Sequence, residues 1–256
     1  MTLEELHQHF LNSKLVSTDT RKISTNSIFF ALKGDNFNGN LYAKEAISKG
    51  ASLAVVDEEE YANGTTIVQV KDVLTTLQQL ANFHRKHCKA KIISITGSNG
   101  KTTTKELINV VLSKKYKTIA TKGNLNNHIG VPLTLLSIKE DTEVAVVEMG
   151  ANHKKEIAFL CTIAEPDFGY ITNFGKAHLE GFGSLNGVIE GKSELYDYLT
   201  ANKKHIFLNA DDPIQKEKLG GYIQKFGFSQ EQKEHYPIKL INANPFVSLK
   251  AEGILI

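Results

Sequence analysis

Short apolar runs alternate with helical stretches from residue 92 onward, and this alternation constrains the fold more than any other feature. Strands are expected at 92–95, 118–120, 144–147, 168–172 and 205–208, and helices at 102–113, 131–137, 156–163 and 185–199. Such alternation predicts a parallel sheet with helices on both faces. Ligands of these sheets bind beyond the carboxyl ends of the strands, so we expect the chemistry there.

The fold class is therefore α/β, with two domains expected at 1–82 and 83–256. The first is predicted to be small and mixed, with a capping box at Thr2 and Glu5 opening a helix at 4–11. Further elements are strands at 28–32, 52–56 and 66–70, a helix at 41–49 ending at Gly50, and an apolar helical stripe from 73 to 81. Two strands, 238–242 and 247–256, close the sequence. A buried strand rarely ends a chain, so we expect an incomplete polypeptide.

Composition excludes several classes of protein. The net charge is only +2 and the basic residues are scattered, which disfavours a nucleic-acid surface. No apolar run approaches the roughly 20 residues that span a bilayer, and the N-terminus lacks the pattern of a signal peptide. Cys88 and Cys161 have no metal-site spacing, which predicts reduced thiols in a cytoplasmic protein.

The loop after the 92–95 strand reads TGSNGKTT and leads into a helix. Backbone amides in such a turn hold phosphate oxygens, and the helix dipole adds to the attraction. The terminal phosphates of a nucleoside triphosphate are the predicted ligands of Gly97, Ser98, Asn99, Gly100, Lys101, Thr102 and Thr103, and the resemblance described below implies that the nucleotide is ATP. Lys101 would neutralise the terminal phosphates, and the Thr102 hydroxyl would bind Mg²⁺. Ile95 stands where the general pattern has its first glycine, which disfavours a plain ATPase or GTPase switch.

Three more residues are candidates for the chemistry. Glu148 ends the 144–147 strand beside the phosphate loop, where a carboxylate suits Mg²⁺. His178 follows the next strand, with Glu180 as a nearby alternative. Lys192 falls on an apolar helical stripe, so either its amine reaches water from the edge of the stripe or burial lowers its pKa. A neutral amine can add CO₂ to form a carbamate.

The phosphate loop resembles that of the Mur ligase superfamily, which also includes folylpolyglutamate synthases. The resemblance continues through GNLNNHIGVPLTLL (123–136), EMGANHKKEI (148–157), ITNFGKAHLEGFGS (171–184), EGKSEL (190–195) and LNADDP (208–213). More weakly, TDTRKI (18–23) and FFALKG (29–34) resemble the family's uridine-binding segments. Asn38-Gly39-Asn40 stands where relatives usually carry Asp-Gly-His, and Lys155 replaces a glycine, with little expected effect on chemistry.

The resemblance implies an ATP-dependent ligase of cell-wall synthesis. Its implied substrates are UDP-N-acetylmuramoyl-tripeptide and D-alanyl-D-alanine, joined through an acyl phosphate. Lys101, His178 and Lys192 are the implied catalytic residues. Thr102, Glu148, His178 and Lys192, the last as a carbamate, are the implied Mg²⁺ ligands. Thr20, Arg21, Lys33, Gly34, Asn126 and Asn127 are implied to bind substrate, although both asparagines could simply cap a helix. Asp211 or Asp212 is expected to cap a helix as well.

The family's third domain, which supplies adenine contacts and most of the site for the incoming amine, has no counterpart in this sequence. We therefore expect the chain to bind UDP-sugar and ATP weakly and not to ligate alone. Two alternatives stay open at this point: a Mur-type ligase with a different amino-acid substrate, and a non-catalytic nucleotide-binding fragment.

Overall fold

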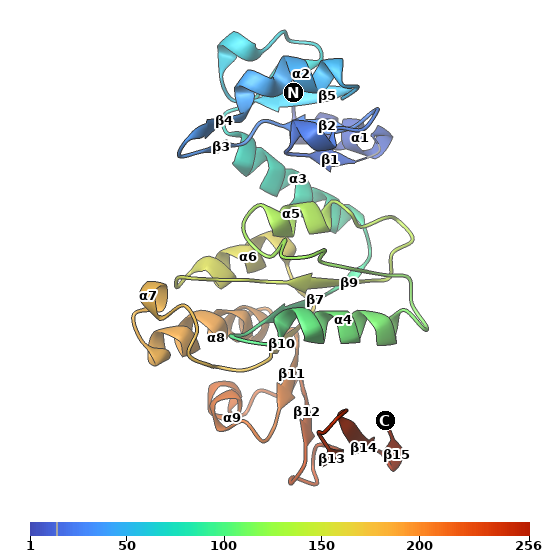
Figure 1. The fold of residues 1–256 in the computed structure, drawn as a ribbon, viewed down its shortest axis with the longest axis vertical. Helices are drawn as coiled ribbons and strands as arrows, with labels where there is room; N and C mark the ends of the chain where they lie inside the picture. The colour runs from blue at the N-terminus through green and yellow to red at the C-terminus, as the bar shows by residue number, and fades with distance from the viewer. Residues whose placement is uncertain (14) are drawn as a thin grey trace.

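The computed structural model describes residues 1–13 and 15–256 (Figure 1). A small parallel sheet lies near the N-terminus, in the order β1-β2-β5-β6. Its strands are β1 (Val16–Ser17), β2 (Ile28–Phe30), β5 (Leu53–Val56) and β6 (Ile67–Gln69). β2 and β5 are buried along their whole length. Alternate residues of these strands face two separate apolar clusters, which explains why their sequences are continuously apolar.

Short helices and a hairpin surround this sheet. They are α1 (Leu3–Asn12), α2 (Ala43–Ser48), the 3₁₀ turns η1 (Thr20–Lys22), η2 (Gly39–Tyr42) and η3 (Glu59–Tyr61), and the hairpin of β3 (Lys33–Gly34) with β4 (Phe37–Asn38). The capping box predicted at Thr2 and Glu5 is confirmed, because each side chain accepts from the other residue's backbone N–H. Gly50, at φ 103°, follows α2 as expected.

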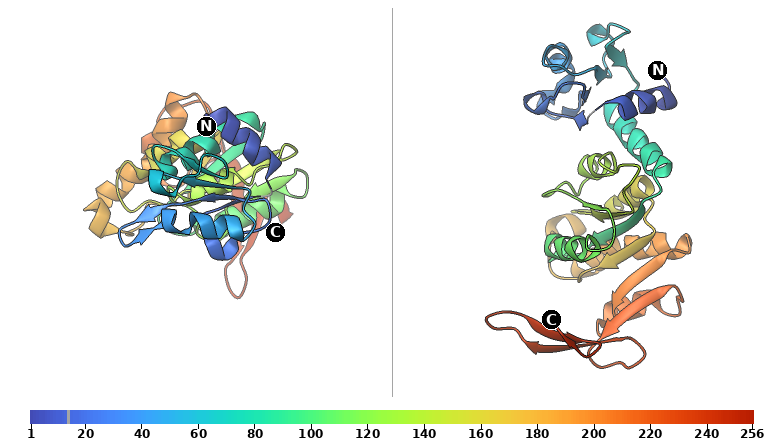
Figure 2. Two further views of the ribbon diagram at one scale, coloured as in Figure 1. Left: turned by 90° about the horizontal axis from the view of Figure 1, so that it is seen from above. Right: turned by 90° about the vertical axis from the view of Figure 1, so that its right-hand side faces the viewer.

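Helix α3 (Val73–His87) connects the N-terminal sheet to the larger one (Figure 2). It packs against α1 on one side and against α5 and α6 on the other. His84 of α3 lies 3.1 Å (Nδ1) from His7 Nε2 of α1 and 2.8 Å (Nε2) from the Ile138 carbonyl oxygen. The expected domain boundary at 82/83 falls inside this helix, so the division at that point stays a prediction.

The larger sheet has the order β15-β14-β13-β12-β11-β10-β7-β9-β8. Its strands are β7 (Lys91–Thr96), β8 (Thr118–Ala120), β9 (Val144–Glu148), β10 (Phe168–Ile171), β11 (His205–Asn209), β12 (Lys225–Ser229), β13 (Tyr236–Asn242), β14 (Ser248–Ala251) and β15 (Ile254–Leu255). Pairing from β8 to β13 is parallel, whereas β14 and β15 are antiparallel additions. The predicted parallel sheet is confirmed, with an antiparallel edge that the sequence pattern did not indicate.

Helices cover both faces of the sheet at β7, β8 and β9, as predicted. α4 (Lys101–Leu112) packs on β7, β8 and β9, while α5 (Gly130–Leu135), α6 (Glu156–Ala164) and α8 (Leu185–Ala201) pack together on the opposite face. α7 (Leu179–Phe182) precedes α8, and α9 (Pro213–Leu219) begins at an N-cap that Asp212 provides. Among the described residues, no helix is both long and apolar enough to cross a membrane.

The end of the chain differs from expectation. The segment 247–256 was expected to form one buried strand, but it forms the short strands β14 and β15 of a hairpin. Ile254, Leu255 and Ile256 are 66%, 68% and 69% exposed, so the expectation of a buried closing strand is wrong. Apolar composition alone did not separate an exposed edge hairpin from a core strand.

Candidate active site

The parallel register brings the ends of β7, β9 and β10 to one edge of the sheet. Ile95 pairs with Glu148, and Thr96 pairs with Ile171. The phosphate loop follows β7 at this edge, and the segment from Thr172 to Gly175 follows β10. The sheet therefore places three separate sequence motifs side by side at the edge where ligands of parallel sheets bind.

Two glycines give the phosphate loop its shape. Gly97 has φ 138°, and a Cβ at this position would lie 2.0 Å from Thr172 Oγ1. Gly100 has φ 77° and forms the N-cap of α4. Because side chains rarely adopt either conformation, both positions require glycine for this turn.

Part of the loop is bonded to the segment after β10. The amide of Ser98 donates to the Asn173 carbonyl oxygen at 3.1 Å, and the amide of Asn99 donates to Asn173 Oδ1 at 3.2 Å. The amides that begin α4 lack acceptors within the helix, as in any helix first turn. Phosphate oxygens would therefore be held chiefly by the turn from Gly100 to Thr103, where the helix dipole also favours an anion.

Lys101 lies over the loop that precedes it. Its Nζ donates to the carbonyl oxygens of Gly97 at 2.8 Å and Ser98 at 3.3 Å. Burial lowers the pKa of Lys101, and the charge of Glu148 opposes this shift. The ammonium is thus already at the loop where a terminal phosphate would carry negative charge.

Glu148 is a buried carboxylate, only 1% exposed, with a donor on each oxygen. Thr102 Oγ1 donates to Oε2 at 3.0 Å, and Asn126 Nδ2 donates to Oε1 at 2.8 Å. Lys105, which is fully buried in α4, places its Nζ 4.0 Å from Oε2. Glu148 is therefore held in one orientation at the edge of the sheet.

These donors suit Mg²⁺. A hydroxyl and a carboxylate oxygen 3.0 Å apart are the hard oxygen ligands that this ion accepts. No group of three or more His, Cys, Asp or Glu side chains in the described parts of the chain could hold a metal by itself. Mg²⁺ commonly takes one or two protein oxygens together with phosphates and water, so the small protein contribution fits this ion.

Asn126 and Asn127, both predicted to bind substrate, make contacts within the protein. Asn126 orients Glu148, and a Cβ at Gly150 would lie 2.7 Å from its Oδ1. Asn127 Oδ1 accepts from the amides of Ile129 and Gly130 at the start of α5. The capping alternative raised for Asn127 thus describes what its side chain does in this structure.

Lys192 is buried, being 1% exposed, so the alternative in which its amine reaches water is wrong. Its Nζ donates to the Ala151 carbonyl oxygen at 3.0 Å and lies 5.2 Å from the centre of the Phe182 ring. Burial, helped by the charge of Lys101, lowers the pKa of Lys192 to about 8.

His178 lies at the start of α7 with φ 54°, and it is exposed, as is Glu180. Its carbonyl oxygen accepts from the amides of Gly181 and Phe182. Within the described residues, the structure joins Thr102, Asn126 and Glu148 by hydrogen bonds, whereas the His178 ring has no bond to this group.

A separate cavity of about 570 Å³ lies in the N-terminal part of the chain. It is lined by Thr18, Asp19, Thr20, Arg21, Phe29, Phe37, Tyr42 and Glu45. The rings of Phe37 and Tyr42 stack with centroids 5.4 Å apart. Thr20 and Arg21, predicted to bind substrate, line this cavity, whereas Lys33 and Gly34 are absent from its lining.

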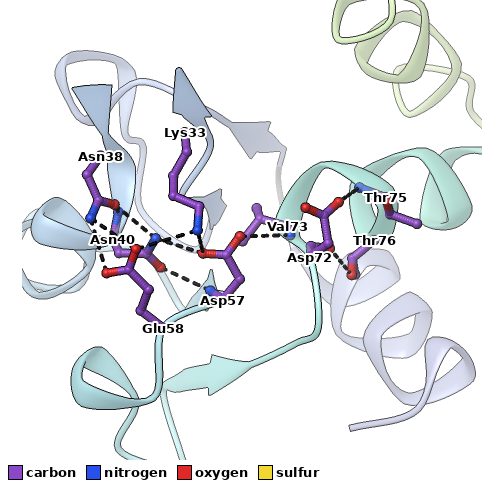
Figure 3. Close-up of polar contacts among 9 residues, drawn as sticks. All are labelled: Lys33, Asn38, Asn40, Asp57, Glu58, Asp72, Val73, Thr75 and Thr76. Carbon is purple, nitrogen blue, oxygen red and sulfur yellow. Dashed lines mark hydrogen bonds and ion pairs between the residues drawn. The ribbon is translucent and has the colours of Figure 1, made fainter. Parts of the chain in front are cut away.

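Lys33 belongs instead to a polar network with residues at the end of β5 (Figure 3). Its Nζ lies 3.0 Å from Asp57 Oδ1 and 3.5 Å from Glu58 Oε1. Asn38 donates to Glu58, and Asn40 donates to Asp57 at 2.9 Å, so the Asn-Gly-Asn turn is tied to the end of β5. These two asparagines thus have structural partners in this chain.

Sequence reasoning missed the support of the phosphate loop by Thr172, Asn173 and Gly175, and the buried ammonium of Lys105. The contacts of Thr172, Asn173 and Gly175 could have been predicted from the sequence, because polar residues directly after one parallel strand meet the loop after the neighbouring strand at the same sheet edge. Nothing in the sequence indicated that Lys105 is buried, because a lysine in the second turn of a helix usually faces solvent.

Comparison with known proteins matches two family models. Residues 12–96 match the Mur ligase family, catalytic domain, and residues 95–253 match the Mur ligase middle domain. The UDP-N-acetylmuramoyl-tripeptide–D-alanyl-D-alanine ligase of Bacillus subtilis is 36% identical over 91% of this chain and 54% of its own length. The Escherichia coli ligase of the same name is 40% identical over 77% of this chain and 43% of its own.

Solved structures with a similar fold point to the same family. The MurF ligase of Thermotoga maritima in complex with ADP has a TM-score of 0.82 at 28% identity, covering 96% of this chain and 58% of that one. An Acinetobacter baumannii MurF structure has a TM-score of 0.80 at 29% identity, and the match covers 98% of this chain and 60% of that one. The chain spans about half the length of the curated relatives it matches.

Proposed function

The chain belongs to the Mur ligase family, and from this premise we propose that it carries the nucleotide-sugar- and ATP-binding parts of a peptidoglycan-precursor ligase. The reaction would join D-alanyl-D-alanine to UDP-N-acetylmuramoyl-tripeptide, as the names of its curated relatives state for those proteins. The observation that carries the proposal is the phosphate loop of Gly97 to Thr103 with Glu148 bonded to Thr102 beside it.

ATP would bind with its terminal phosphates on the first turn of α4. The amides of Gly100 to Thr103 lack helical acceptors, and Lys101 is already turned toward the loop. The similar Thermotoga maritima protein was solved in complex with ADP, which supports a nucleotide ligand for the same fold.

Thr102 and Glu148 would hold Mg²⁺, which when bound neutralises charge on phosphate oxygens. Lys192 and His178 are proposed as further ligands, Lys192 as a carbamate. Burial of the Lys192 amine supports this, because a buried amine is neutral more often and only a neutral amine adds CO₂. For His178 the support is its place in the segment 171–184 that resembles the family.

The proposed chemistry needs no nucleophile from the protein. A carboxylate oxygen of the tripeptide attacks the γ-phosphorus of ATP, the bond to the β-phosphate oxygen breaks, and ADP leaves. The amine of D-alanyl-D-alanine then attacks the acyl carbon, inorganic phosphate leaves, and the amine loses a proton. Lys101 and the α4 amides would stabilise the charge on the transferred phosphoryl group.

The cavity at Thr20 and Arg21 is the proposed site for the uridine end of the substrate. Its polar lining together with the stacked rings of Phe37 and Tyr42 suits a nucleotide base and ribose. A cytoplasmic location is part of the proposal, since UDP-linked precursors and ATP are cytoplasmic metabolites.

Calorimetric titration of the purified chain tests the ATP part. We expect ADP to bind in the presence of Mg²⁺, and Lys101→Ala to weaken binding at least about tenfold, since the lost contact is to a charged group. Lys114→Ala is the matched control, because Lys114 is an exposed lysine just beyond the end of α4. Equal affinities for the two variants would contradict the proposed ATP site.

A second titration tests the substrate. UDP-N-acetylmuramoyl-tripeptide should bind, and Arg21→Ala should weaken it while leaving ADP affinity unchanged. With the ATP and UDP sites verified, incorporation of labelled D-alanyl-D-alanine in preference to a diamino acid, in an assay supplied with the C-terminal half of a relative, would support the dipeptide ligase. Preference for the diamino acid would favour another Mur-type ligase.

A further inference from the structure

The segment after β10 is packed against the phosphate loop along its whole length. Ser98 Oγ donates to the Gly175 carbonyl oxygen at 2.9 Å, and Thr172 Oγ1 donates to the Asn99 carbonyl oxygen at 2.6 Å. A Cβ on Gly97 would lie 2.0 Å from Thr172 Oγ1, and one on Gly175 would lie 2.9 Å from Asn99 Nδ2, so the two segments approach closely at both glycines. We refer to residues 172–175 as the brace.

Asn173 sits at the centre of the brace and pairs with both backbone groups of a single loop residue, Asn99. Its Oδ1 accepts from the Asn99 amide at 3.2 Å, and its Nδ2 donates to the Asn99 carbonyl oxygen at 3.0 Å. The backbone carbonyl of Asn173 also accepts from the Ser98 amide at 3.1 Å. A side chain that bonds both the N–H and the C=O of one residue needs a donor and an acceptor, and the Asn side-chain amide carries both.

This pairing holds the peptide groups on both sides of Asn99, and the second of them leads into Gly100, the left-handed residue from which α4 starts. The direction of the first α4 amides and of Lys101 follows from that turn. Ser98 and Asn99 themselves offer no spare amide, because both already donate to Asn173. Their contribution to phosphate binding is therefore the shape that the brace imposes on the loop.

We propose that Asn173 is a positioning residue that sets the phosphate loop in its binding geometry before nucleotide arrives. The expected effect of Asn173 on nucleotide affinity rests on the proposed function. Its effect on the conformation of the phosphate loop does not. His178 follows the brace by three residues in the chain.

The test compares Asn173→Leu, which has similar volume and no polar group, with Asn173→Asp, which keeps the acceptor for the Asn99 amide and loses the donor. Asn202→Leu is the matched control, since it also removes an amide-to-carbonyl bond, to Tyr198 at 2.8 Å at the end of α8. Two quantities are measured: amide hydrogen exchange at Asn99 without nucleotide, and ADP affinity with Mg²⁺.

We expect Asn173→Leu to speed exchange at Asn99 about tenfold or more and to weaken ADP binding about tenfold, whereas Asn173→Asp keeps the Asn99 amide protected. Exchange in β7 and the melting temperature should match those of the control variant. Unchanged exchange at Asn99 in Asn173→Leu would overturn the proposal, as would faster exchange with unchanged ADP affinity. If the wild-type chain failed to bind ADP, the proposed function would fall, and the exchange result would still decide the role of Asn173.

Discussion

Lys155 adopts a backbone conformation that lysine disfavours, and replacing it with glycine should stabilise the protein. It precedes α6 with φ 72° and ψ −5°, in the left-handed region. The sequence alone suggested that lysine at this position has little consequence for the chemistry. In the structure the consequence is for stability, because a Cβ in this region crowds the following carbonyl group.

The size of the effect follows from two opposing terms. Left-handed geometry costs a non-glycine residue about 1–2 kcal/mol. Glycine is more flexible in the unfolded chain, which removes about 0.4–1 kcal/mol of the gain. The Lys155 side chain is exposed, and its backbone amide, which donates to Glu194 Oε1 at 2.5 Å, is retained in the variant. The net expectation is a rise in the free energy of unfolding of about 0.5–1 kcal/mol.

Thermal unfolding followed by circular dichroism measures this change. For a chain of this size the melting temperature should rise by about 1–4 °C. Lys114→Gly serves as the control, because Lys114 is exposed and is not among the residues with positive φ, so glycine there should lower stability. A Lys155→Gly variant no more stable than wild type would refute the reasoning about strain.

Three further outcomes are expected. Asp167 accepts from Arg85 at 3.0 Å and from Lys204 at 2.9 Å. Asp167→Ala should lower the free energy of unfolding by about 2–4 kcal/mol in denaturant titrations, because the largely buried Arg85 and the partly exposed Lys204 lose their partner. Burial lowers the pKa of His7 from 6.5 to about 4, so between pH 6.5 and pH 4 the unfolded state binds more protons than the folded state. The free energy of unfolding should therefore fall by about 1–2 kcal/mol from pH 7 to pH 5, measured by the same denaturant titrations. With ¹³C-labelled bicarbonate, a carbamate signal from Lys192, whose pKa is about 8, should grow between pH 7 and pH 9 in NMR spectra and be absent in Lys192→Arg.

Much of the fold could be predicted because its periodic segments are long and buried. The strands β7 and β9 read as apolar runs since both of their faces are covered. The segments that escaped prediction are partly exposed. β12 alternates lysine and glycine with phenylalanine, and the hairpin of β14 and β15 is apolar in sequence yet exposed in space.

In the candidate site, sequence reasoning found residues whose type suits a ligand, but it could not assign their partners. The place of Glu148 at a strand end was predictable from the strand itself. Asn126 orients this carboxylate from 22 residues away in the sequence, and Asn173 braces a phosphate-loop residue that lies 74 residues before it. Such contacts follow from strand order, which the alternation of elements leaves open.

The strand order also has a consequence for how the chain is made. β7 leaves the ribosome before either of its neighbours, since β9 (Val144–Glu148) and β10 (Phe168–Ile171) are encoded later. An apolar strand with two unpaired edges would therefore persist during synthesis until both partners emerge. Slow translation between these segments would lengthen that exposure, so this stretch is where we expect nascent chains to recruit chaperones.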